Sequence, residues 1–280
     1  MRKLYSPKTV REIMDLYGFK FTKSLGQNFL IDKNFVDKII GSADPRGKNI
    51  IEIGPGLGTI GYEAAKVCKN LILVEIDRKL IPILKENFSE FDNTRIINED
   101  FLKLDLEDLI EKDFGGEDYQ VISNLPYYIT TPIIEKLIES KKPPRKMTIM
   151  VQKEVADRIL ADVGDKDYSS LSVFIKFFAK ASRVTNVPKT VFMPKPKVDS
   201  AVLDLDLRLY DDSVDKKKVF DLVRAGFNKR RKTILNSLSS VVSKDKLCLA
   251  FENLGIHSNL RAENLSLDDY INLVKVIETL

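Results

Sequence analysis

The sequence predicts an α/β fold that is built around a parallel β-sheet and is followed by a smaller, all-helical domain. Short runs rich in Ile and Val alternate with helix-like segments between residues 49 and 151, a pattern typical of strands buried on both faces. A glycine-rich turn follows the first of these runs and leads into a helix. After residue 213 the strand signals stop, and only helical patterns remain.

Two helices are expected before the sheet begins. Ser6 can cap the first one, Pro7 suits its first position, and Gly18 can end it. The apolar residues between them follow the spacing of one helix face: Val10, Ile13, Met14 and Tyr17. Asp32 can cap a second, shorter helix after a loop, so we treat residues 1–45 as an N-terminal helical extension.

Apolar runs predict the parallel strands of the sheet. They are residues 49–54 (NIIEIG), 71–77 (LILVEID), 95–100 (RIINED), 121–125 (VISNL) and 147–151 (MTIMV). Helix-like segments such as IGYEAAKVC and TTPIIEKLIES lie between them. Near residue 200, the run DSAVLDLDLRL alternates apolar side chains with Asp204, Asp206 and Arg208. This alternation predicts a half-exposed strand that closes the sheet.

The C-terminal region predicts three helices. They are expected within residues 219–242 (VFDLVRAGFNKRRKTILNSLSSVV), 246–255 (KLCLAFENLG) and 266–280 (SLDDYINLVKVIETL). Gly255 can cap the second helix, and Ser266 with Asp269 forms a capping box for the third. We place a domain boundary near residues 207–213, which divides the chain into domains 1–210 and 211–280.

Positive charge is concentrated in parts of a chain whose net charge is only +4. Residues 1–33 hold seven Lys or Arg against three Asp or Glu, and residues 224–232 (RAGFNKRRK) hold five basic residues and no acidic one. Such clusters favour a polyanionic partner, and a solvated helix face is the alternative explanation.

Cysteine usage and hydropathy indicate the compartment. The two cysteines lie far apart in the sequence and form no CxxC motif, which argues against a disulfide framework or a structural zinc site. No apolar run approaches the length of a membrane span, and the N-terminal residues lack the apolar core of a leader peptide. We therefore expect a cytoplasmic protein that binds neither membrane nor metal.

The glycine-rich turn IEIGPGLGTIG (residues 51–61) predicts a nucleotide site. Gly56, Gly58 and Gly61 fit GxGxxG, the dinucleotide pattern, whereas Glu52, Gly54, Gly56 and Gly58 fit ExGxGxG, the pattern of S-adenosylmethionine methyltransferases. The strand ends at Gly54, so the first glycine of the turn is Gly54, which favours the second pattern.

Polar residues recur where the next strands end. Glu75 can bind a ribose at the end of the second strand, and its competitor Asp77 is better placed to cap the following helix. Asp100 follows the third strand and could accept a hydrogen bond from an exocyclic amine, with a helix cap as the alternative. Gly54, Glu75, Asp100 and Asn124 thus follow four successive strands at the edge where such sheets bind ligands.

Asn124 ends the fourth predicted strand within SNLPYYITTP (residues 123–132). A turn with aromatic core residues is the ordinary explanation. The alternative is a clamp for a flat, amino-bearing base, in which the carboxamide oxygen and a backbone carbonyl each accept one N–H and aim the nitrogen lone pair. Pro126 would stiffen the loop, and Tyr127 could stack on the base, a contact worth roughly 1–3 kcal/mol at other nucleic-acid sites. Catalysis would then depend on positioning and electrostatics.

Several motifs together resemble a known family. They are residues 23–30 (KSLGQNFL), 51–60 (IEIGPGLGTI), 123–133 (SNLPYYITTPI), 191–202 (VFMPKPKVDSAV), 227–238 (FNKRRKTILNSL) and 260–266 (LRAENLS). From about residue 6 to 275 the chain resembles the KsgA/RsmA family of ribosomal RNA small-subunit adenine N6,N6-dimethyltransferases. The resemblance implies a Rossmann-like class I fold with a mostly parallel seven-stranded sheet and a small all-α C-terminal domain. It also implies S-adenosylmethionine as cofactor and S-adenosylhomocysteine as product.

The resemblance also implies roles for individual residues. The cofactor would contact Gln27, Asn28, Leu30, Gly54, Gly56, Glu75, Ile76, Asp100, Phe101 and Asn124. The target amine and base would be held by Asn124, Leu125, Pro126 and Tyr127, with Phe192 stacking from the other side. RNA would be bound by Arg224, Lys229, Arg230, Arg231 and Lys232. Without the resemblance, Phe192 would be an ordinary core aromatic, and Gln27 and Asn28 ordinary loop residues.

The expected reaction is methylation of two adjacent adenosines in the 3′-terminal hairpin of small-subunit (16S) rRNA during late subunit biogenesis. The partners would be the small ribosomal subunit and its rRNA, and the enzyme itself would be a monomer. Three alternatives remain open: a related enzyme that methylates large-subunit rRNA, an RNA-binding assembly factor without chemistry, and a nicotinamide-dependent dehydrogenase. The last would need the other glycine register and an acid–base residue that the sequence does not supply.

Overall fold

The computed structural model describes residues 3–19, 21–22, 25–207, 214–229 and 231–280. The fold separates into two compact units, residues 1–156 with 182–207 and residues 157–181 with 208–280, which we call the sheet unit and the helical unit. The helical unit thus takes in residues 157–181, which our predicted boundary assigns to the first domain. The assignment of catalysis to one domain and RNA binding to the other stays a prediction.

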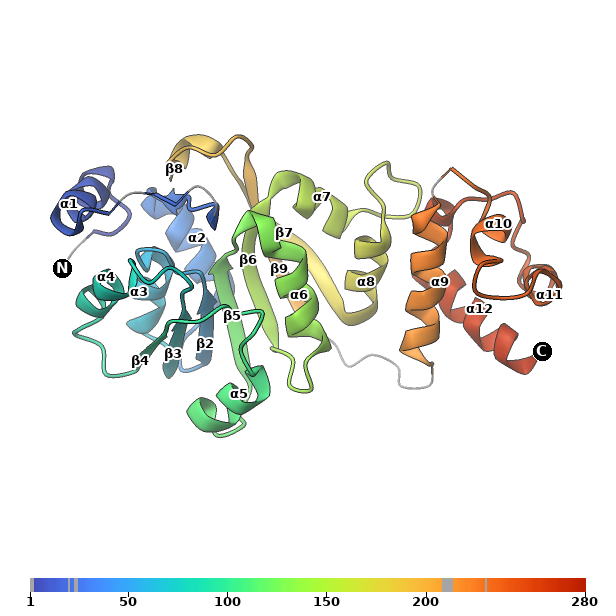
Figure 1. Ribbon diagram of the computed structural model, residues 1–280, viewed down its shortest axis with the longest axis horizontal. Coiled ribbons are helices and arrows are strands. Elements are labelled where there is room, and N and C mark those ends of the chain that lie inside the picture. Colours follow the sequence, from blue (N-terminus) through green and yellow to red (C-terminus); the bar gives the residue numbers. More distant parts are fainter. Residues whose placement is uncertain (1–2, 20, 23–24, 208–213, 230) are drawn as a thin grey trace. The chain divides into compact units, whose positions relative to one another are not determined.

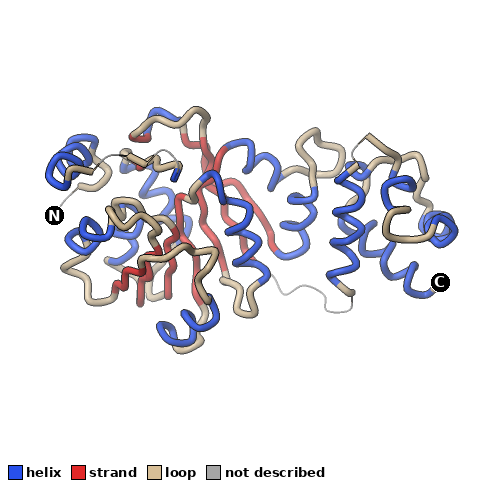
Figure 2. The backbone as a smooth tube through the Cα atoms, in the orientation of Figure 1, coloured by secondary structure: helices blue, strands red, loops and turns tan. Residues whose placement is uncertain are grey.

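The described strands of the sheet unit form a seven-stranded sheet in the order β4-β3-β2-β5-β6-β9-β7 (Figures 1 and 2). Their bounds are β2 Asn49–Ile53, β3 Asn70–Val74, β4 Thr94–Ile97, β5 Tyr119–Asn124, β6 Lys146–Gln152, β7 Ala179–Val187 and β9 Ser200–Leu207. Strands β2 to β6 pair in parallel, and β9 pairs antiparallel with β6. The predicted mostly parallel seven-stranded sheet is therefore confirmed.

Helices cover the sheet because alternate strand residues bury opposite faces. Ile50, Leu71 and Ile122 share one core with apolar residues of the N-terminal helices, while α6 lies across the other face (Figure 1). The helices of this region are α1 Pro7–Tyr17, α2 Lys33–Ala43, α3 Thr59–Ala65, α4 Ile81–Asn87, α5 Leu106–Phe114, α6 Thr130–Glu139 and α7 Lys153–Leu160. Short 3-10 helices η2 (Tyr127–Ile129) and η3 (Lys189–Val191) lie in the connections.

The two N-terminal helices begin where predicted, and the first also ends where predicted, although the side chain of Ser6 makes no capping hydrogen bond. Pro7 occupies the first turn of α1, and Gly18 ends that helix in the left-handed region at φ 59°. The carboxylate of Asp32 accepts a hydrogen bond from the amide of Asn34 at 2.8 Å and so caps α2. A second, two-stranded antiparallel sheet follows, in which β1 (Phe29–Leu30) pairs with β8 (Phe192–Met193).

The prediction for β9 was wrong in its exposure and its place. Most of this strand is buried, and it lies between β6 and β7 rather than at the end of the sheet. The buried Asp204 is accommodated because it accepts hydrogen bonds from Ser42 and Thr148, both at 2.7 Å, and pairs with Lys146 at 2.8 Å. Arg208 and Leu209, the end of the predicted alternation, lie outside the described residues.

The helical unit has its own core, to which α8 (Ser170–Phe178) and the C-terminal helices contribute. The other elements are α9 Lys216–Asn228, α10 Ile234–Leu238, α11 Lys244–Leu254, η4 Ala262–Asn264 and α12 Leu267–Thr279. The single helix predicted over residues 219–242 is instead divided into α9 and α10, because Thr233 caps a new helix. Gly255 and the box of Ser266 with Asp269 cap α11 and α12 as predicted.

Candidate active site

A pocket lies where the carboxyl ends of the central parallel strands meet. Gly54 directly follows β2, Glu75 directly follows β3, and Asn124 is the last residue of β5. All three line the pocket, together with Leu25, Gly26, Gln27, Asn28, Phe29, Leu30, Glu52, Pro55, Gly56, Thr59, Ile60, Ile76, Leu80, Leu125, Pro126, Tyr127 and Tyr128. Three of the four residues that were predicted to meet at the strand ends therefore line one pocket.

The glycine-rich turn forms one wall of the pocket. Gly54 and Gly56 have φ values of 64° and 62°, in the left-handed region that favours glycine. A Cβ atom on Gly56 would lie 2.7 Å from the Phe29 ring, so this close approach also excludes a side chain. Helix α3 begins at Thr59, and its first backbone N–H groups therefore lie next to the pocket.

Glu75 is held rigidly at the end of β3. Its side chain is 4% exposed, and its two carboxylate oxygens accept hydrogen bonds from the amides of Gly56 (3.1 Å) and Asp77 (2.8 Å). Burial raises the pKa of Glu75 to about 7, although these two amides favour the charged form. Each oxygen keeps a further lone pair that can accept a hydroxyl, as ribose binding requires.

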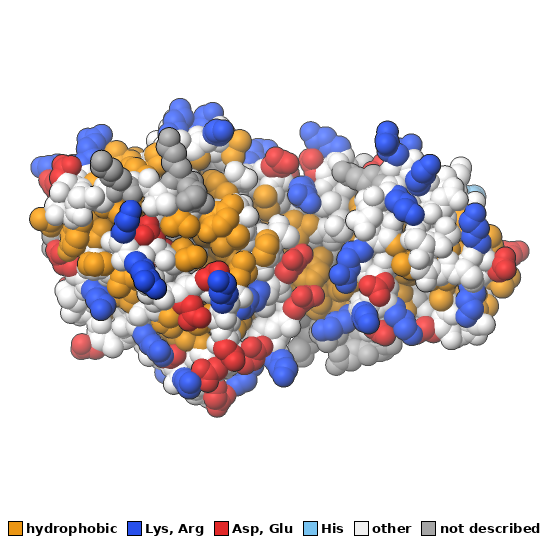
Figure 3. Space-filling view, in the orientation of Figure 1, with side chains coloured by type: hydrophobic (Ala, Val, Ile, Leu, Met, Phe, Trp, Pro, Cys, Tyr) orange, Lys and Arg blue, Asp and Glu red, His pale blue; other side chains and the backbone are white. Residues whose placement is uncertain are grey.

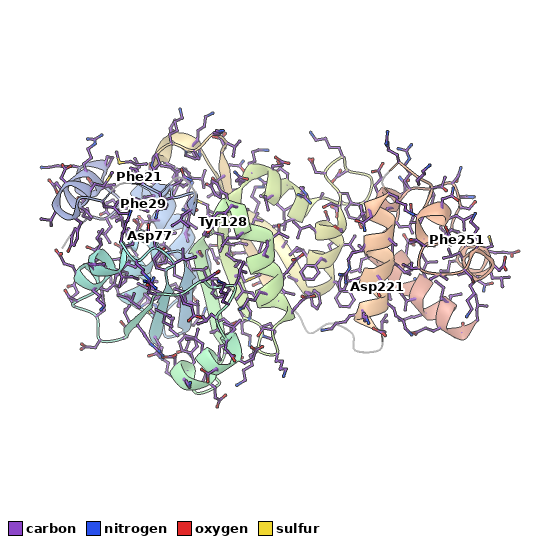
Figure 4. All side chains as sticks on the ribbon, in the orientation of Figure 1. Phe21, Phe29, Asp77, Tyr128, Asp221 and Phe251 are labelled. Carbon is purple, nitrogen blue, oxygen red and sulfur yellow. The ribbon has the colours of Figure 1, made fainter. Side chains whose placement is uncertain are left out.

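Asp77, the competing carboxylate, is engaged elsewhere. Its side chain accepts hydrogen bonds from Nε2 of Gln27 at 2.7 Å and from the amide of Lys79 at 3.1 Å. The second bond fits the predicted capping role. The Oε1 atom of Gln27 in turn accepts the amide of Thr22 at 2.8 Å. Gln27 therefore ties the N-terminal segment to the strand end beside Glu75, as the labelled positions of Asp77, Phe21 and Phe29 illustrate (Figure 4).

The N-terminal segment also reaches Asn124. The Nδ2 atom of Asn124 donates a hydrogen bond to the backbone carbonyl of Asn28 at 3.0 Å, across 96 positions of sequence. This bond fixes the plane of the carboxamide. The other atom, Oδ1, is buried and has no hydrogen-bond partner among the described residues. A buried acceptor without a partner costs about 1–3 kcal/mol, so the site offers an acceptor to a donor from a ligand.

The residues after Asn124 form a stiff rim. The amide of Leu125 donates to the carbonyl of Met150 at 3.0 Å, and the Pro126 ring lies against Gly54, whose Cβ would approach it to 3.2 Å. The hydroxyl of Tyr127 and that of the buried Ser200 share a hydrogen bond of 2.6 Å. This bond anchors the far end of the tyrosine and leaves its ring as a fixed wall of the pocket.

Three predicted site residues do not line the pocket. The Asp100 carboxylate accepts the amide of Leu102 at 3.0 Å, which is the capping arrangement that we considered as the alternative. Phe101 is 4% exposed and lies beside the ammonium group of Lys136. Phe192 is 3% exposed in the core, where β8 pairs it with Leu30.

Nine residues that line the pocket were not among the predicted site residues, and two of these nine, Tyr128 and Glu52, carry ionisable side chains. Tyr128, labelled in Figure 4, is 51% exposed and packs against Gly26, and burial together with the charges of Asp100 and Glu75 raises the pKa of its hydroxyl. The second tyrosine of the Pro-Tyr-Tyr stretch was the signal for it. Glu52 is buried in the pocket wall, and the first letter of the ExGxGxG pattern was its signal.

The predicted RNA-binding residues lie around the end of α9 in the helical unit. Arg224, Lys229, Arg231 and Lys232 are exposed, and Lys and Arg side chains stand out on this unit in Figure 3. Within the described part of the chain, Lys229, Arg231 and Lys232 have no acidic partner. Arg230 lies outside the described residues. Helix α9 ends at Asn228 and α10 begins at Ile234, so Lys229, Arg231 and Lys232 lie in the segment between the two helices, whereas Arg224 lies on α9.

Two features are absent from the described residues. They contain no helix long and apolar enough to cross a membrane. They also bring together no group of three or more His, Cys, Asp or Glu side chains that could hold a metal ion.

Residues 18–279 match the protein family described as ribosomal RNA adenine dimethylase. The chain is 43% identical, over all of its length, to the ribosomal RNA small subunit methyltransferase A of Clostridioides difficile (strain 630), of which 98% is covered. It is 47% identical to the protein of that name from Alkaliphilus oremlandii (strain OhILAs), with 96% of each chain covered.

Solved structures show the same architecture. A dimethyladenosine transferase from Plasmodium falciparum superposes with a TM-score of 0.76 at 27% identity, over 90% of this chain and 98% of that one. The 23S rRNA methyltransferase ErmE shares the fold with a TM-score of 0.70 at 24% identity, over 89% of this chain and 99% of its own.

Proposed function

Given that the chain belongs to the ribosomal RNA adenine dimethylase family, we propose that it methylates the N6 atoms of two adjacent adenosines in the 3′-terminal hairpin of small-subunit (16S) rRNA. The chain is an S-adenosylmethionine-dependent rRNA adenine dimethyltransferase. The hairpin, the pair of adenosines and the timing in late subunit biogenesis are the proposal. So are a monomeric state, a cytoplasmic location and the small subunit as partner.

The buried, unpartnered Oδ1 of Asn124 is the observation that carries the proposal. An adenine amine has two N–H groups, and Oδ1 can accept one of them. The carbonyl of Leu125, on the adjoining rim, is our candidate acceptor for the other. Two such bonds would hold the amine so that its lone pair points out of the ring plane, toward the donor of the methyl group. Bonds that strengthen as the nitrogen becomes tetrahedral would lower the barrier.

The pocket also fits the cofactor. Bound S-adenosylmethionine supplies an activated methyl group on a sulfonium centre. We propose that Gly54 and Gly56 give it close access to the backbone, that Glu75 accepts its ribose hydroxyls, and that Asn28 and Leu30 contact it from the N-terminal segment. Ile76 is 41% exposed in the pocket wall and offers an apolar surface to the adenine ring.

Asp100, Phe101 and Phe192 do not line the pocket, so we propose roles for them that require neighbouring side chains to move. Asp100 would bind the adenine amine through the carboxylate oxygen that does not cap Leu102, and Phe101 would pack beneath it. Phe192 would stack on the target base only if the side chains that bury it move aside. Tyr127 is better placed for stacking because its ring already lines the pocket. In the helical unit, Lys229, Arg231 and Lys232 would contact RNA phosphates.

The function is tested by methylating unmodified small subunits with labelled S-adenosylmethionine, then digesting the RNA and analysing its nucleosides by mass spectrometry. We expect N6,N6-dimethyladenosine from the 3′-terminal hairpin. Product from large-subunit RNA alone would refute the proposed target. Cofactor binding without product on either RNA would favour an assembly factor that has lost its chemistry.

A further inference from the structure

Gln27 lines the pocket, but both ends of its side chain are bonded to the protein itself. Its Nε2 atom donates a hydrogen bond to Oδ2 of Asp77 at 2.7 Å, and its Oε1 atom accepts the amide of Thr22 at 2.8 Å. A primary amide has one acceptor end and one donor end, and here the acceptor end faces an N–H and the donor end faces a carboxyl group. The orientation of this side chain is therefore fixed by the fold.

Asp77 depends on the same contact. Its side chain is 8% exposed, and no Lys or Arg side chain pairs with it within the part of the chain that the structure describes. Its Oδ1 atom accepts the amide of Lys79 at 3.1 Å, and Oδ2 accepts the hydroxyl of Thr22 at 3.4 Å as well as Nε2 of Gln27. A buried carboxyl group without a cation is stabilised only by such donors. Gln27 supplies the shortest of the three bonds.

Gln27 directly precedes Asn28, whose backbone carbonyl orients the carboxamide of Asn124. That carbonyl accepts Nδ2 of Asn124 at 3.0 Å, and this bond decides where Oδ1 points. After Asn28 the chain is held by the pairing of β1 with β8. Before it, the side chain of Asn28 bonds only to the carbonyl of Gly26 in the same loop, at 2.8 Å, so Gln27 supplies the anchor to the sheet. The carbonyl thus lies between two anchors, and Gln27 is one of them.

We propose that Gln27 is a positioning residue, which through its bond to Asp77 holds the carbonyl of Asn28 where it aligns Asn124 for methyl transfer. This role differs from the direct contact with the cofactor that the resemblance implies for Gln27. The inference rests on the proposed function, because it relies on the role given there to Oδ1 of Asn124. The arrangement itself can be tested in the free protein, without RNA and without turnover.

The experiment exchanges the two groups of the pair. Gln27→Glu places two carboxylates against each other, and their repulsion should open the contact. Asp77→Asn should weaken the contact less, because the new amide can still offer its oxygen either to Gln27 or to the amide of Lys79, but not to both. The double variant Gln27→Glu with Asp77→Asn again has one donor facing one acceptor. In it the amides of Thr22 and Lys79 also keep an acceptor each, so the contact should be restored.

Two quantities are compared between the variants, the rate of single-turnover methylation of small subunits and the affinity for S-adenosylhomocysteine measured by calorimetry. We expect Gln27→Glu to lower the rate roughly 10- to 100-fold, the scale expected when a reacting group is displaced by about 1 Å. The affinity should stay within a few-fold, because the pairing of β1 with β8 still holds Leu30 in place. The double variant should recover most of the lost rate.

Asn49→Asp is the matched control for the introduced repulsion. Asn49 is buried at the first position of β2, at the opposite edge of the sheet, and its Nδ2 atom donates to Oε2 of Glu117 at 3.2 Å. The variant therefore sets two carboxylates against each other far from the pocket. It should lower stability and leave the methylation rate unchanged.

Nuclear magnetic resonance of protein labelled with 15N-asparagine gives a readout that needs no turnover. The side-chain amide signal of Asn124 is identified by its absence from Asn124→Ala. In the unaltered protein its protons should exchange slowly with water, because one of them is bonded to the carbonyl of Asn28. Exchange should be faster in Gln27→Glu and slow again in the double variant.

The outcomes separate this role from its alternatives. An unaltered rate and an unaltered Asn124 signal in Gln27→Glu would overturn the proposal, and so would a loss that the double variant does not recover. A loss of S-adenosylhomocysteine affinity as large as the loss of rate would assign Gln27 to the cofactor instead. If the unaltered protein transfers no methyl group to small subunits, the proposed function fails, while the Asn124 signal still decides whether Gln27 aligns Asn124.

Discussion

We predict that Asn124→Ala does not greatly destabilise the protein but strongly lowers its rate of methyl transfer. In the free protein the carboxamide makes one hydrogen bond, from Nδ2 to the carbonyl of Asn28, and leaves Oδ1 buried without a partner. Loss of the bond costs about 0.5–1.5 kcal/mol, while removal of an unsatisfied oxygen returns about 1–3 kcal/mol. The two effects oppose each other, so the change in the free energy of unfolding should lie between a loss of about 0.5 kcal/mol and a gain of about 2.5 kcal/mol.

Catalysis should respond very differently to the same change. Without Oδ1 the target amine loses one of its two acceptors and with it the alignment of its lone pair. Removal of a comparable preorganised group from other enzymes costs roughly 100- to 1,000-fold in kcat, and we expect at least that here. Binding of S-adenosylhomocysteine should stay within a few-fold, because Glu75 and the glycine turn are unaltered.

Single-turnover methylation of small subunits, calorimetric titration and urea unfolding measure the three quantities. Ser123→Ala is the matched control, because Ser123 is also buried on β5 and its hydroxyl donates to the carbonyl of Ile53 at 2.5 Å. That variant should lose about 1 kcal/mol of stability and keep kcat within a few-fold. Normal turnover by Asn124→Ala would refute the role of Oδ1, and a large loss of stability would refute the reasoning about its burial.

Three further predictions concern the cofactor, the RNA and the glycine turn. Glu75→Ala should weaken S-adenosylhomocysteine binding by calorimetry more than Asp77→Asn does, because Asp77 bonds to the chain rather than to the ligand. Replacing Arg231 and Lys232 with Ala should weaken RNA binding and reduce the slope of log affinity against log salt by up to about two, measured by filter binding. Gly56→Ala should destabilise the fold by roughly 2–5 kcal/mol in urea unfolding, because it combines a positive φ with contact to Phe29.

Control variants test the physical explanation of each of these three predictions. Lys244 and Lys246 are exposed lysines of α11, and their replacement changes net charge equally, so an equal loss of salt dependence would mean a non-specific charge effect. Gly47 has φ 67° but open space around it, so Gly47→Ala measures backbone strain alone. A Gly56→Ala protein no less stable than Gly47→Ala would contradict the packing argument. If Asp77→Asn weakened S-adenosylhomocysteine binding more than Glu75→Ala does, then Asp77 rather than Glu75 would be the carboxylate that binds the ribose.

The fold was predictable where burial leaves a simple pattern. Strands β2, β3, β5 and β6 are apolar runs because both faces of a parallel sheet are covered, whereas β4 lies at the end of the sheet and is only partly buried. Strand β7 was missed because its residues are mostly polar and only partly buried, as suits a strand at the end of the sheet. The burial of β9 could not be read from its alternation, since Asp204 is stabilised by partners on two distant elements, Ser42 on α2 and Lys146 and Thr148 on β6.

The site was predictable where a residue acts through its place on a strand. Gly54, Glu75 and Asn124 were predicted in this way and line one pocket, while their roles stay predictions. Contacts made by the N-terminal segment were not, because the bond from Asn124 to Asn28 depends on how a loop folds back over the sheet. Tyr128 was missed although it adjoins Tyr127 in the sequence, because its contact with Gly26 also depends on how the N-terminal loop folds.

The pairing of β1 with β8 determines when the enzyme can become active during its own synthesis. Leu30 pairs with Phe192, and the segment that carries Leu30 also supplies the carbonyl that orients Asn124. At about 5–20 residues per second, a ribosome needs roughly 10–30 s to translate from one partner to the other. Strand β1 therefore stays unpaired in the nascent chain until β8, near the end of the sheet unit, has been synthesised. The active site of this rRNA-modifying protein can therefore be completed only after most of the chain has emerged from the ribosome that synthesises it.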